Sequence, residues 1–225
     1  MEKVLKLYKN LGETPLECLE RFRAENLEYA DVPMTYAGRL DPMAEGLLVV
    51  LTGDECKKKD EYLGLDKEYV FEVMLGVQSD TYDVLGIPKM SEKKDFDIKS
   101  FVIKRVQEYP AYSSRTFEKA RSGEEFEAPT KEVEIYGLEE LEMREISARE
   151  ALAEISRRIS LVHGDFRQEQ ILDAWQKILG NSNQNFEIKK FKINCSSGTY
   201  VRSITNEMGG LAYSIYRTKV GEYKI

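Results

Sequence analysis

The chain of 225 residues is 42% hydrophobic and 32% charged, with a net charge of −7, which is the composition of an ordinary soluble globular protein. Its length is enough for one large domain or two small ones. No apolar run approaches the length of a membrane span, and the first residues lack the apolar centre and small-residue cleavage site of a signal peptide. We therefore expect a cytoplasmic protein.

The cysteines and the single histidine restrict the chemistry. Cys18, Cys56 and Cys195 are far apart in the sequence, no CxxC pair occurs, and His163 is the only histidine. Neither a structural zinc site nor a disulfide framework fits this pattern. One histidine also argues against a Ser-His-Asp or Cys-His mechanism, so catalysis would have to rest on carboxylates, tyrosines, arginines or lysines.

The net charge, taken alone, argues against a nucleic-acid partner, because phosphate neutralisation usually requires a basic surplus. The distribution of charge is uneven, however: residues 132–169 carry a net charge of −5 and residues 186–225 a net charge of +4. The basic C-terminal segment leaves room for one electropositive face. Scattered solvated charges are the alternative interpretation.

The first third of the chain predicts strands separated by short helices. Thr14-Pro15-Leu16-Glu17 is a capping box, with proline at the first helical position, and it predicts a helix to about Arg23. The apolar run at 47–51 and the β-branched and aromatic residues at 68–75 are typical of strands. We also expect a strand at 4–8 and a short charged helix at 53–64.

The rest of the chain predicts further helices and strands. A second capping box, Ser147-Ala148-Arg149-Glu150, begins a helix to about Ser160. The other expected elements are, in chain order, a polar loop at 76–86, a helix at 97–108, a breaker at 110–114, a short helix ending at Gly123, a strand at 133–143, a helix at 168–179 that contains Trp175, a strand at 186–195, a helix from Thr199 to about Met208, and short final strands. Because strands and helices alternate without regular βαβ spacing, we predict an α+β fold with a mostly antiparallel mixed sheet.

The segment YAGRLDPMAEG at 36–46 places Asp41 before a proline and between two glycines, directly ahead of the apolar run. Pro42 restricts Asp41 to an extended backbone, and Gly38 and Gly46 permit close approach of another chain or a ligand. An Asp-Pro pair is also an ordinary N-cap followed by a first-turn proline. Two interpretations of Asp41 therefore stay open: a turn residue, or a nucleophile at the floor of a cleft.

Four segments resemble, in order, the motifs of the TruB family of pseudouridine synthases. They are GRLDPMAEGLLVVLTGDECK at 38–57, KEYVFEVMLGVQSDTYDVLG at 67–86, SSGTYVRSITNEMG at 196–209 and YRTKVGEY at 216–223. YKNLGETP at 8–15 and PAYSS at 110–114 are similar to that family's first motif and to the edge of its RNA-gripping loop. The resemblance runs from residue 8 to the C-terminus, with a gap in the middle.

The resemblance implies a bent sheet with an RNA-binding cleft, and isomerisation of uridine to pseudouridine at position 55 of the T-loop of tRNA, without a cofactor or metal. It implies that Asp41 initiates the reaction, either by attacking the sugar carbon or by removing a proton from the sugar. Arg202 corresponds to the arginine that holds this aspartate. Tyr69 corresponds to the tyrosine that stacks on the flipped base.

The resemblance also implies roles for further residues. Tyr200 and Ile215 correspond to pocket-lining residues, and Arg217 and Lys219 to a basic strand that faces RNA phosphates. Tyr36 stands where the family usually has a histidine, and a tyrosine can still stack and donate a hydrogen bond. The plain alternatives are a strand tyrosine in the core for Tyr69, a surface position for Arg202, and solvated charge for Arg217 and Lys219.

Two rival functions stay open. Asp80 and Asp83 match a family loop near the cleft, where we expect them to have structural roles. The alternative pairs one of them with Asp41 as the acid and base of a glycosidic hydrolase. The second rival is a catalytically silent tRNA-binding protein on the same scaffold.

The chain departs from the family pattern in three places. A helical insertion at about 139–185, expected to pack on the outside, stands where many relatives pass directly from strand to strand. The gripping loop near 112–132 is shorter and less basic. The chain stops soon after VGEY, where many relatives continue into a PUA domain, so we expect a single catalytic domain over 1–225, acting as a monomer on the T-arm stem-loop.

Overall fold

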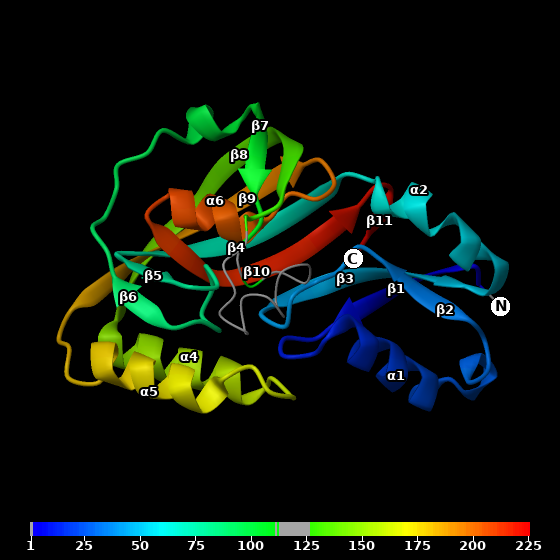
Figure 1. Ribbon diagram of the computed structural model, residues 1–225, viewed down its shortest axis with the longest axis horizontal. Helices are drawn as coiled ribbons and strands as arrows, with labels where there is room; N and C mark the ends of the chain where they lie inside the picture. The colour runs from blue at the N-terminus through cyan, green and yellow to red at the C-terminus, as the bar shows by residue number, and fades with distance from the viewer. Residues whose placement is uncertain (1, 111, 113–126) are drawn as a thin grey trace.

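The computed structural model describes residues 2–110, 112 and 127–225, and one mixed sheet runs through them (Figure 1). Its nine described strands have the spatial order β1-β3-β10-β4-β9-β8-β7, with β2 beside β3 and β11 beside β10. All pairs are antiparallel except β3 with β10. The predicted α+β fold with a mostly antiparallel sheet is confirmed. The strands are β1 (Val4–Lys9), β2 (Met34–Ala37), β3 (Ala44–Thr52), β4 (Lys67–Leu75), β7 (Lys104–Glu108), β8 (Thr130–Ser147), β9 (Asn185–Cys195), β10 (Gly210–Val220) and β11 (Tyr223–Lys224), and a separate small sheet holds β5 (Val77–Ser79) and β6 (Pro88–Met90).

The apolar run that follows Asp41 forms β3, and both of its faces are buried. Leu48 and Val50 pack with α1 (Pro15–Glu25), while Leu47, Val49 and Leu51 pack on the opposite side. A strand that is covered on both faces needs apolar residues at every position, which accounts for an uninterrupted run in place of alternation.

Helices cover both faces of the central strands β4, β9 and β10. The helix α6 (Val201–Glu207) packs on one face, and α4 (Ala148–Ser160) and α5 (Gln168–Leu179) pack on the other (Figure 1). In β9 the side chains alternate accordingly, since Ile188 belongs to the α4–α5 core and Phe191 and Ile193 to the α6 core. The remaining helical segments are the 3₁₀ turns η1 (Leu27–Tyr29), η2 (Gly53–Lys58) and η3 (Ile98–Phe101) and the short α2 (Lys59–Leu63).

Both predicted capping boxes are present. Thr14 accepts a hydrogen bond from the backbone N–H of Glu17, whose carboxylate accepts one from the N–H of Thr14. Ser147 and Glu150 repeat the arrangement at the start of α4. These reciprocal bonds satisfy N–H groups that have no partner within the helix, and they explain why both helices begin where the sequence predicts.

The predicted helix at 97–108 is wrong. Its residues form η3 and then β7, which pairs with the start of β8. The apolar side chains do not share one buried face: Phe101 is buried, but Val106 is 65% exposed and the polar Gln107 is 2% exposed. Tertiary pairing with β8 therefore decided the conformation, and the buried amide of Gln107 is hydrogen-bonded to the backbone of Tyr200, the residue before α6.

Two other boundaries differ from the expectation. Residues 139–147 continue β8 alongside β9, so the helices of the insertion lie within 148–179. The expected short final strands are, in the main, one long strand, β10, which joins β3 to β4. The short helix expected to end at Gly123 lies outside the described residues.

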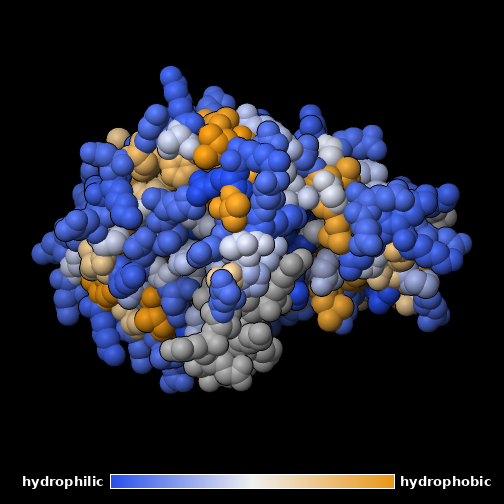
Figure 2. Space-filling model, turned by 45° about the horizontal axis from the view of Figure 1, so that its top comes forward, coloured by the Kyte–Doolittle hydropathy of each residue, from blue (hydrophilic) through white to orange (hydrophobic). Residues whose placement is uncertain are grey.

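The described helices include none that is long and apolar enough to cross a membrane. On the face shown in Figure 2, hydrophilic residues predominate and the apolar residues form small separate patches. The larger apolar side chains are concentrated in the cores that flank the sheet.

Replacing Trp175 by alanine tests the packing of the insertion. The Trp175 side chain is fully buried, and its indole N–H donates to the carbonyl oxygen of Val84 at 3.0 Å. We expect the free energy of unfolding to fall by about 3–5 kcal/mol, measured by urea denaturation followed by far-ultraviolet circular dichroism. Leu141→Ala, at an exposed position of β8, is the control and should change it by about 0.5 kcal/mol or less. Equal effects of the two changes would show that packing in the α4–α5 core contributes no more to the free energy of unfolding than an exposed side chain does.

Candidate active site

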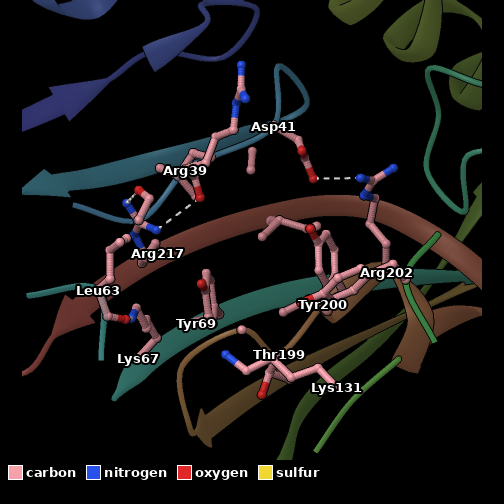
Figure 3. A pocket seen from close by; sticks show the side chains of 17 residues that line it. Arg39, Asp41, Leu63, Lys67, Tyr69, Lys131, Thr199, Tyr200, Arg202 and Arg217 are labelled. Carbon is pink, nitrogen blue, oxygen red and sulfur yellow. Dashed lines mark hydrogen bonds and ion pairs between the residues drawn. The ribbon is translucent and has the colours of Figure 1, made fainter. Parts of the chain in front are cut away.

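A pocket of about 290 Å³ opens where the loop before β3 meets β4, β10 and α6 (Figure 3). Six of the residues predicted for the site line it, although they are distributed over most of the chain: Asp41, Tyr69, Tyr200, Arg202, Ile215 and Arg217. The sheet order explains this meeting, because β10 lies between β3 and β4 and α6 directly precedes β10.

The centre of the pocket is an ion pair between Asp41 and Arg202. An Nη2–H of Arg202 donates to Oδ2 of Asp41 at 2.9 Å, as the dashed line in Figure 3 marks. The arginine side chain is 4% exposed, whereas the aspartate side chain is 28% exposed. The buried cation therefore holds a carboxylate that still reaches the pocket.

Arg202 is itself held from behind. Its Nη1 donates to the carbonyl oxygen of Thr81 at 2.7 Å, and the carbonyl oxygen of Tyr112 accepts from Nη1 and Nη2 at 3.4 and 3.3 Å. Oδ2 of the buried Asp83 lies 3.5 Å from Nη1. Burial alone would lower the pKa of Arg202, but the carboxylates of Asp41 and Asp83 raise it above its usual value, so the guanidinium stays charged.

Asp41 lies in a turn that is fixed at both ends. The N–H of Ala44 donates to the carbonyl oxygen of Asp41 at 3.0 Å, and the N–H of Gly12 donates to that of Pro42 at 2.8 Å. Gly46 has φ of +107°, and a Cβ there would lie 2.4 Å from the carbonyl oxygen of Arg217. Only glycine fits this position, because β3 and β10 approach each other too closely for a side chain.

Arg217 fixes the same turn, and its position differs from the expected one. The side chain is 1% exposed, and its donors reach the carbonyl oxygens of Leu47 at 2.8 Å, Gly38 at 3.0 Å and Arg39 at 3.3 Å. A guanidinium occupied by three backbone carbonyls inside the protein is not presented to RNA phosphates. The structure instead gives Arg217 the role of anchoring the segment that carries Asp41.

Tyrosines form the opposite wall of the pocket. Tyr69 comes from β4 and is 8% exposed, and burial raises the pKa of its hydroxyl even though Arg217 opposes that effect. Tyr200 precedes α6, and its ring centre lies 4.8 Å from that of Tyr109. Gln107 holds Tyr200 by two bonds, accepting from its N–H at 2.8 Å and donating to its carbonyl oxygen at 3.2 Å. The pocket thus combines one carboxylate with aromatic surfaces.

Positive charge predominates along the pocket wall. Among the described residues, its lining contains five cationic side chains, Arg39, Lys67, Lys131, Arg202 and Arg217, and one carboxylate, that of Asp41. Within residues 2–110, 112 and 127–225, no group of three or more acidic, histidine or cysteine side chains could hold a metal ion. The pocket is therefore suited to an anionic ligand with a planar group, such as a nucleotide.

The comparison with known families agrees with this chemistry. The model described as TruB family pseudouridylate synthase (N terminal domain) matches residues 31–164, which is more than half of the chain. The chain belongs to the TruB family.

Curated relatives and solved structures extend the comparison. The chain is 29% identical, over 84% of its length, to a protein named tRNA pseudouridine synthase B of Borreliella afzelii (strain PKo), and 28% identical, over 95%, to one of the same name of Trichormus variabilis (strain ATCC 29413 / PCC 7937). It spans 60% and 64% of the length of those two relatives. Among solved structures, it matches a Cbf5-Nop10-Gar1 complex with a TM-score of 0.57 at 16% identity, covering 98% of this chain and 49% of that chain. An H/ACA RNP bound to a substrate RNA containing 2'-deoxyuridine gives 0.55 at 16% identity, covering 98% and 48%. These structural likenesses confirm the predicted fold.

Two residues that the TruB resemblance assigned to substrate lie away from the pocket lining. Tyr36, in β2, packs beside the core under α1, and the ammonium of Lys59 lies 5.5 Å from its ring centre. Lys219 is half-buried near the end of β10, opposite Glu68 and Lys224. Their contact with substrate stays a prediction that the pocket geometry does not support.

The two aspartates of the 80–83 loop are engaged by protein groups. Asp83 is 4% exposed, and its Oδ1 accepts from the hydroxyl of Thr81 at 2.7 Å and the N–H of Leu85 at 2.9 Å. Burial raises the pKa of Asp83, although Arg202 opposes this. Asp80 is paired with Arg167 of the insertion at 2.9 Å. Neither carboxylate lines the pocket, which agrees with the expected structural roles.

Sequence reasoning missed Lys67, Lys131, Arg39 and Gln107. Lys67 stands two residues before Tyr69 on the same strand, so both side chains lie on the same face, and this i, i+2 spacing is the signal that could have found it. Gln107 was missed because the sequence predicted a helix at 97–108, whereas the structure places this residue in β7. Lys131 and Arg39 carry no local signal that separates them from other surface cations.

The buried amine of Lys67 predicts a pH dependence of stability. Burial, with a smaller effect of Arg217, lowers the pKa of Lys67 from 10.5 to about 8. Between about pH 8 and 10.5 the unfolded chain therefore binds more protons at this group than the folded chain, so its contribution to the free energy of unfolding rises with pH. The stability difference between the wild type and Lys67→Met should shift in favour of the wild type by about 2–3 kcal/mol across this window.

This prediction is checked by urea denaturation of both proteins at closely spaced pH values. Lys224→Met changes an exposed lysine and serves as the control, whose difference from the wild type should stay constant. Parallel curves for the wild type and Lys67→Met would show that the amine is not desolvated.

Proposed function

We propose that this chain isomerises uridine to pseudouridine in RNA, at position 55 of the T-loop of tRNA. The glycosidic C–N bond breaks, the base turns, and a C–C bond forms between the same base and the same sugar carbon. The ring carbon that forms this bond gives up its proton and the freed ring nitrogen gains one, so the composition of the nucleotide is unchanged. The observation that supports this most directly is the 2.9 Å pair of Asp41 and Arg202 in a pocket walled by Tyr69.

The pair meets the needs of a reaction initiated by a carboxylate. Whether it attacks the sugar carbon or removes a sugar proton, Asp41 must be ionised, close to the sugar and shielded from bulk water. Arg202 supplies a fixed positive charge 2.9 Å from Oδ2 of Asp41, and the 28% exposure of the Asp41 side chain leaves it reachable. The isomerisation balances without an oxidant, reductant or cofactor.

Tyr69 and the cationic side chains that line the pocket are suited to binding the substrate nucleotide. A uridine inside folded RNA has to leave its stack to reach the pocket, and an aromatic ring compensates for part of the lost stacking. Arg39 and Lys131 line the pocket together with the buried cations, and positive charge there favours the phosphates on either side of the flipped nucleotide. We infer RNA binding that weakens with salt, recognition of the T-arm stem-loop, and action as a monomer in the cytoplasm.

The hydrolase alternative has less support. It needs a second carboxylate across a water-filled cleft from Asp41. Asp83 is buried and bound by Thr81 and Leu85, and Asp80 is paired with Arg167. Asp41 is the only carboxylate among the described residues that line the pocket, so these residues offer no second carboxylate to activate water.

The decisive change is Asp41→Asn, which keeps the size of the side chain and removes its charge. We expect pseudouridine formation in an unmodified tRNA transcript to fall by at least about 100-fold, because an amide can neither attack the sugar nor accept a proton from it. The product is mapped by carbodiimide treatment and primer extension. Asp54→Asn changes a carboxylate whose side chain is 94% exposed and should leave the rate unchanged.

The outcomes separate the rival functions. A T-loop stop with the wild type that Asp41→Asn lacks would support the proposal. Salt-sensitive tRNA binding without modification would favour the catalytically silent RNA-binding protein. Release of free uracil would favour the hydrolase.

A further inference from the structure

The turn that connects α4 to α5 brings the helical insertion close to the residues that hold Arg202. Arg167, the residue before α5, has φ of +63° and ψ of +28°. In the described part of the chain only Tyr82 shares a positive φ among non-glycine residues, and Tyr82 lies in the 80–83 loop that Arg167 contacts. A left-handed backbone is costly for an arginine, so the surrounding structure must hold this residue in place.

The Arg167 guanidinium joins two segments that are far apart in sequence. Its Nη1 donates to Oδ2 of Asp80 at 2.9 Å and to the hydroxyl of Tyr112 at 3.2 Å. The guanidinium carbon also lies 4.2 Å from the centre of the Tyr112 ring, close enough for a cation–π contact. With 25% of the side chain exposed, the pairing is partly shielded from water.

Both of these partners are connected to Arg202 through backbone carbonyl oxygens. Thr81, the residue after Asp80, presents its carbonyl oxygen to Nη1 of Arg202 at 2.7 Å. Tyr112, whose ring Arg167 covers, presents its own carbonyl oxygen to Arg202 at 3.3 and 3.4 Å. One arginine of the insertion therefore constrains two backbone carbonyls that accept hydrogen bonds from the arginine paired with Asp41.

The insertion is firmly attached at this end. The indole of Trp175 donates to the carbonyl oxygen of Val84, within the segment that follows Asp83. On the far side, Gly12 packs so closely on Leu161 that a Cβ would lie 2.4 Å from the carbonyl oxygen of Leu161. Asp80 also closes its own loop, since Oδ1 accepts from the N–H of Ile87 at 2.8 Å. Arg167 therefore holds Asp80 and Tyr112 from an insertion that is itself fixed to the rest of the protein.

We propose that Arg167 is a positioning residue for the reaction: through Asp80 and Tyr112 it orients Arg202, and through Arg202 it orients Asp41. The proposal rests on the proposed function, and it gives the helical insertion a role in catalysis beyond packing. Arg167 does not line the pocket, and its guanidinium is already engaged, so it acts without touching the RNA.

The test uses Arg167→Gly, because glycine accepts the left-handed backbone without strain and the change removes only the side chain. Displacement of a catalytic group by about 1 Å can cost about 100-fold in rate, and we expect kcat on a tRNA transcript to fall about tenfold or more. KM and the dissociation constant for tRNA should change less than about twofold. Arg167→Lys keeps the charge beside Asp80 but loses the planar contact with Tyr112, so it should recover part of the lost kcat.

Two further variants sharpen the test. Asp80→Asn keeps an oxygen for Ile87 and removes the charge that faces Arg167, so it should reproduce the kcat loss, and the double variant should add little to it. The matched control is Arg157→Ala, which removes an arginine of the same insertion that is paired with Glu154 of its own helix and should leave kcat unchanged. All assays are run at a temperature at which circular dichroism finds each variant fully folded.

An unchanged kcat in folded Arg167→Gly would overturn the proposal. A weaker tRNA affinity with unchanged kcat would also overturn it and make Arg167 an RNA contact. If the wild type itself forms no pseudouridine, the proposed function fails separately. Arginine-selective ¹⁵N spectra then test the positioning itself: the Nη signals of Arg202 should be resolved in the wild type and averaged by rotation in Arg167→Gly, and identical spectra would contradict the proposal.

Discussion

The ion pair between Asp41 and Arg202 is the interaction on which the rest of the site depends. It joins the turn before β3 to the first turn of α6, and Arg202 is almost completely buried while Asp41 keeps access to the pocket. A buried cation is costly unless several acceptors surround it. Thr81, Tyr112 and Asp83 supply those acceptors. The segments that contain these three residues must therefore lie beside the guanidinium of Arg202.

A second arginine fixes the carboxylate side of the pair. Arg217 places its donors on the carbonyl oxygens of Gly38, Arg39 and Leu47, and Gly46 allows β10 to approach β3 at that point. A planar guanidinium carries five donors in a fixed geometry, so it can hold three carbonyls at set positions. Arg217 thus fixes the backbone around Asp41, and Arg202 fixes the orientation of the Asp41 carboxylate.

The insertion of α4 and α5 belongs to the same arrangement. It packs against the face of the sheet opposite α6 and reaches the 80–87 loop through Arg167 and Trp175. That loop supports Arg202 through the carbonyl oxygen of Thr81 and the carboxylate of Asp83. An added structural element can therefore influence the chemistry of the pocket without lining it, provided that it fixes the groups behind the catalytic residues.

Features that depend on near neighbours could be predicted from the amino-acid sequence. The capping boxes at Thr14 and Ser147, the buried strand after Asp41 and the α+β class follow from residues within a few positions of each other, and the resemblance to the TruB motifs indicated Asp41, Tyr69 and Arg202 as candidates. Other features depend on contacts between distant segments. Residues 104–108 became a strand because β8 pairs with them, and Arg217 became an internal anchor because β10 lies between β3 and β4. Such outcomes depend on which strands become neighbours, and local periodicity carries no information about that.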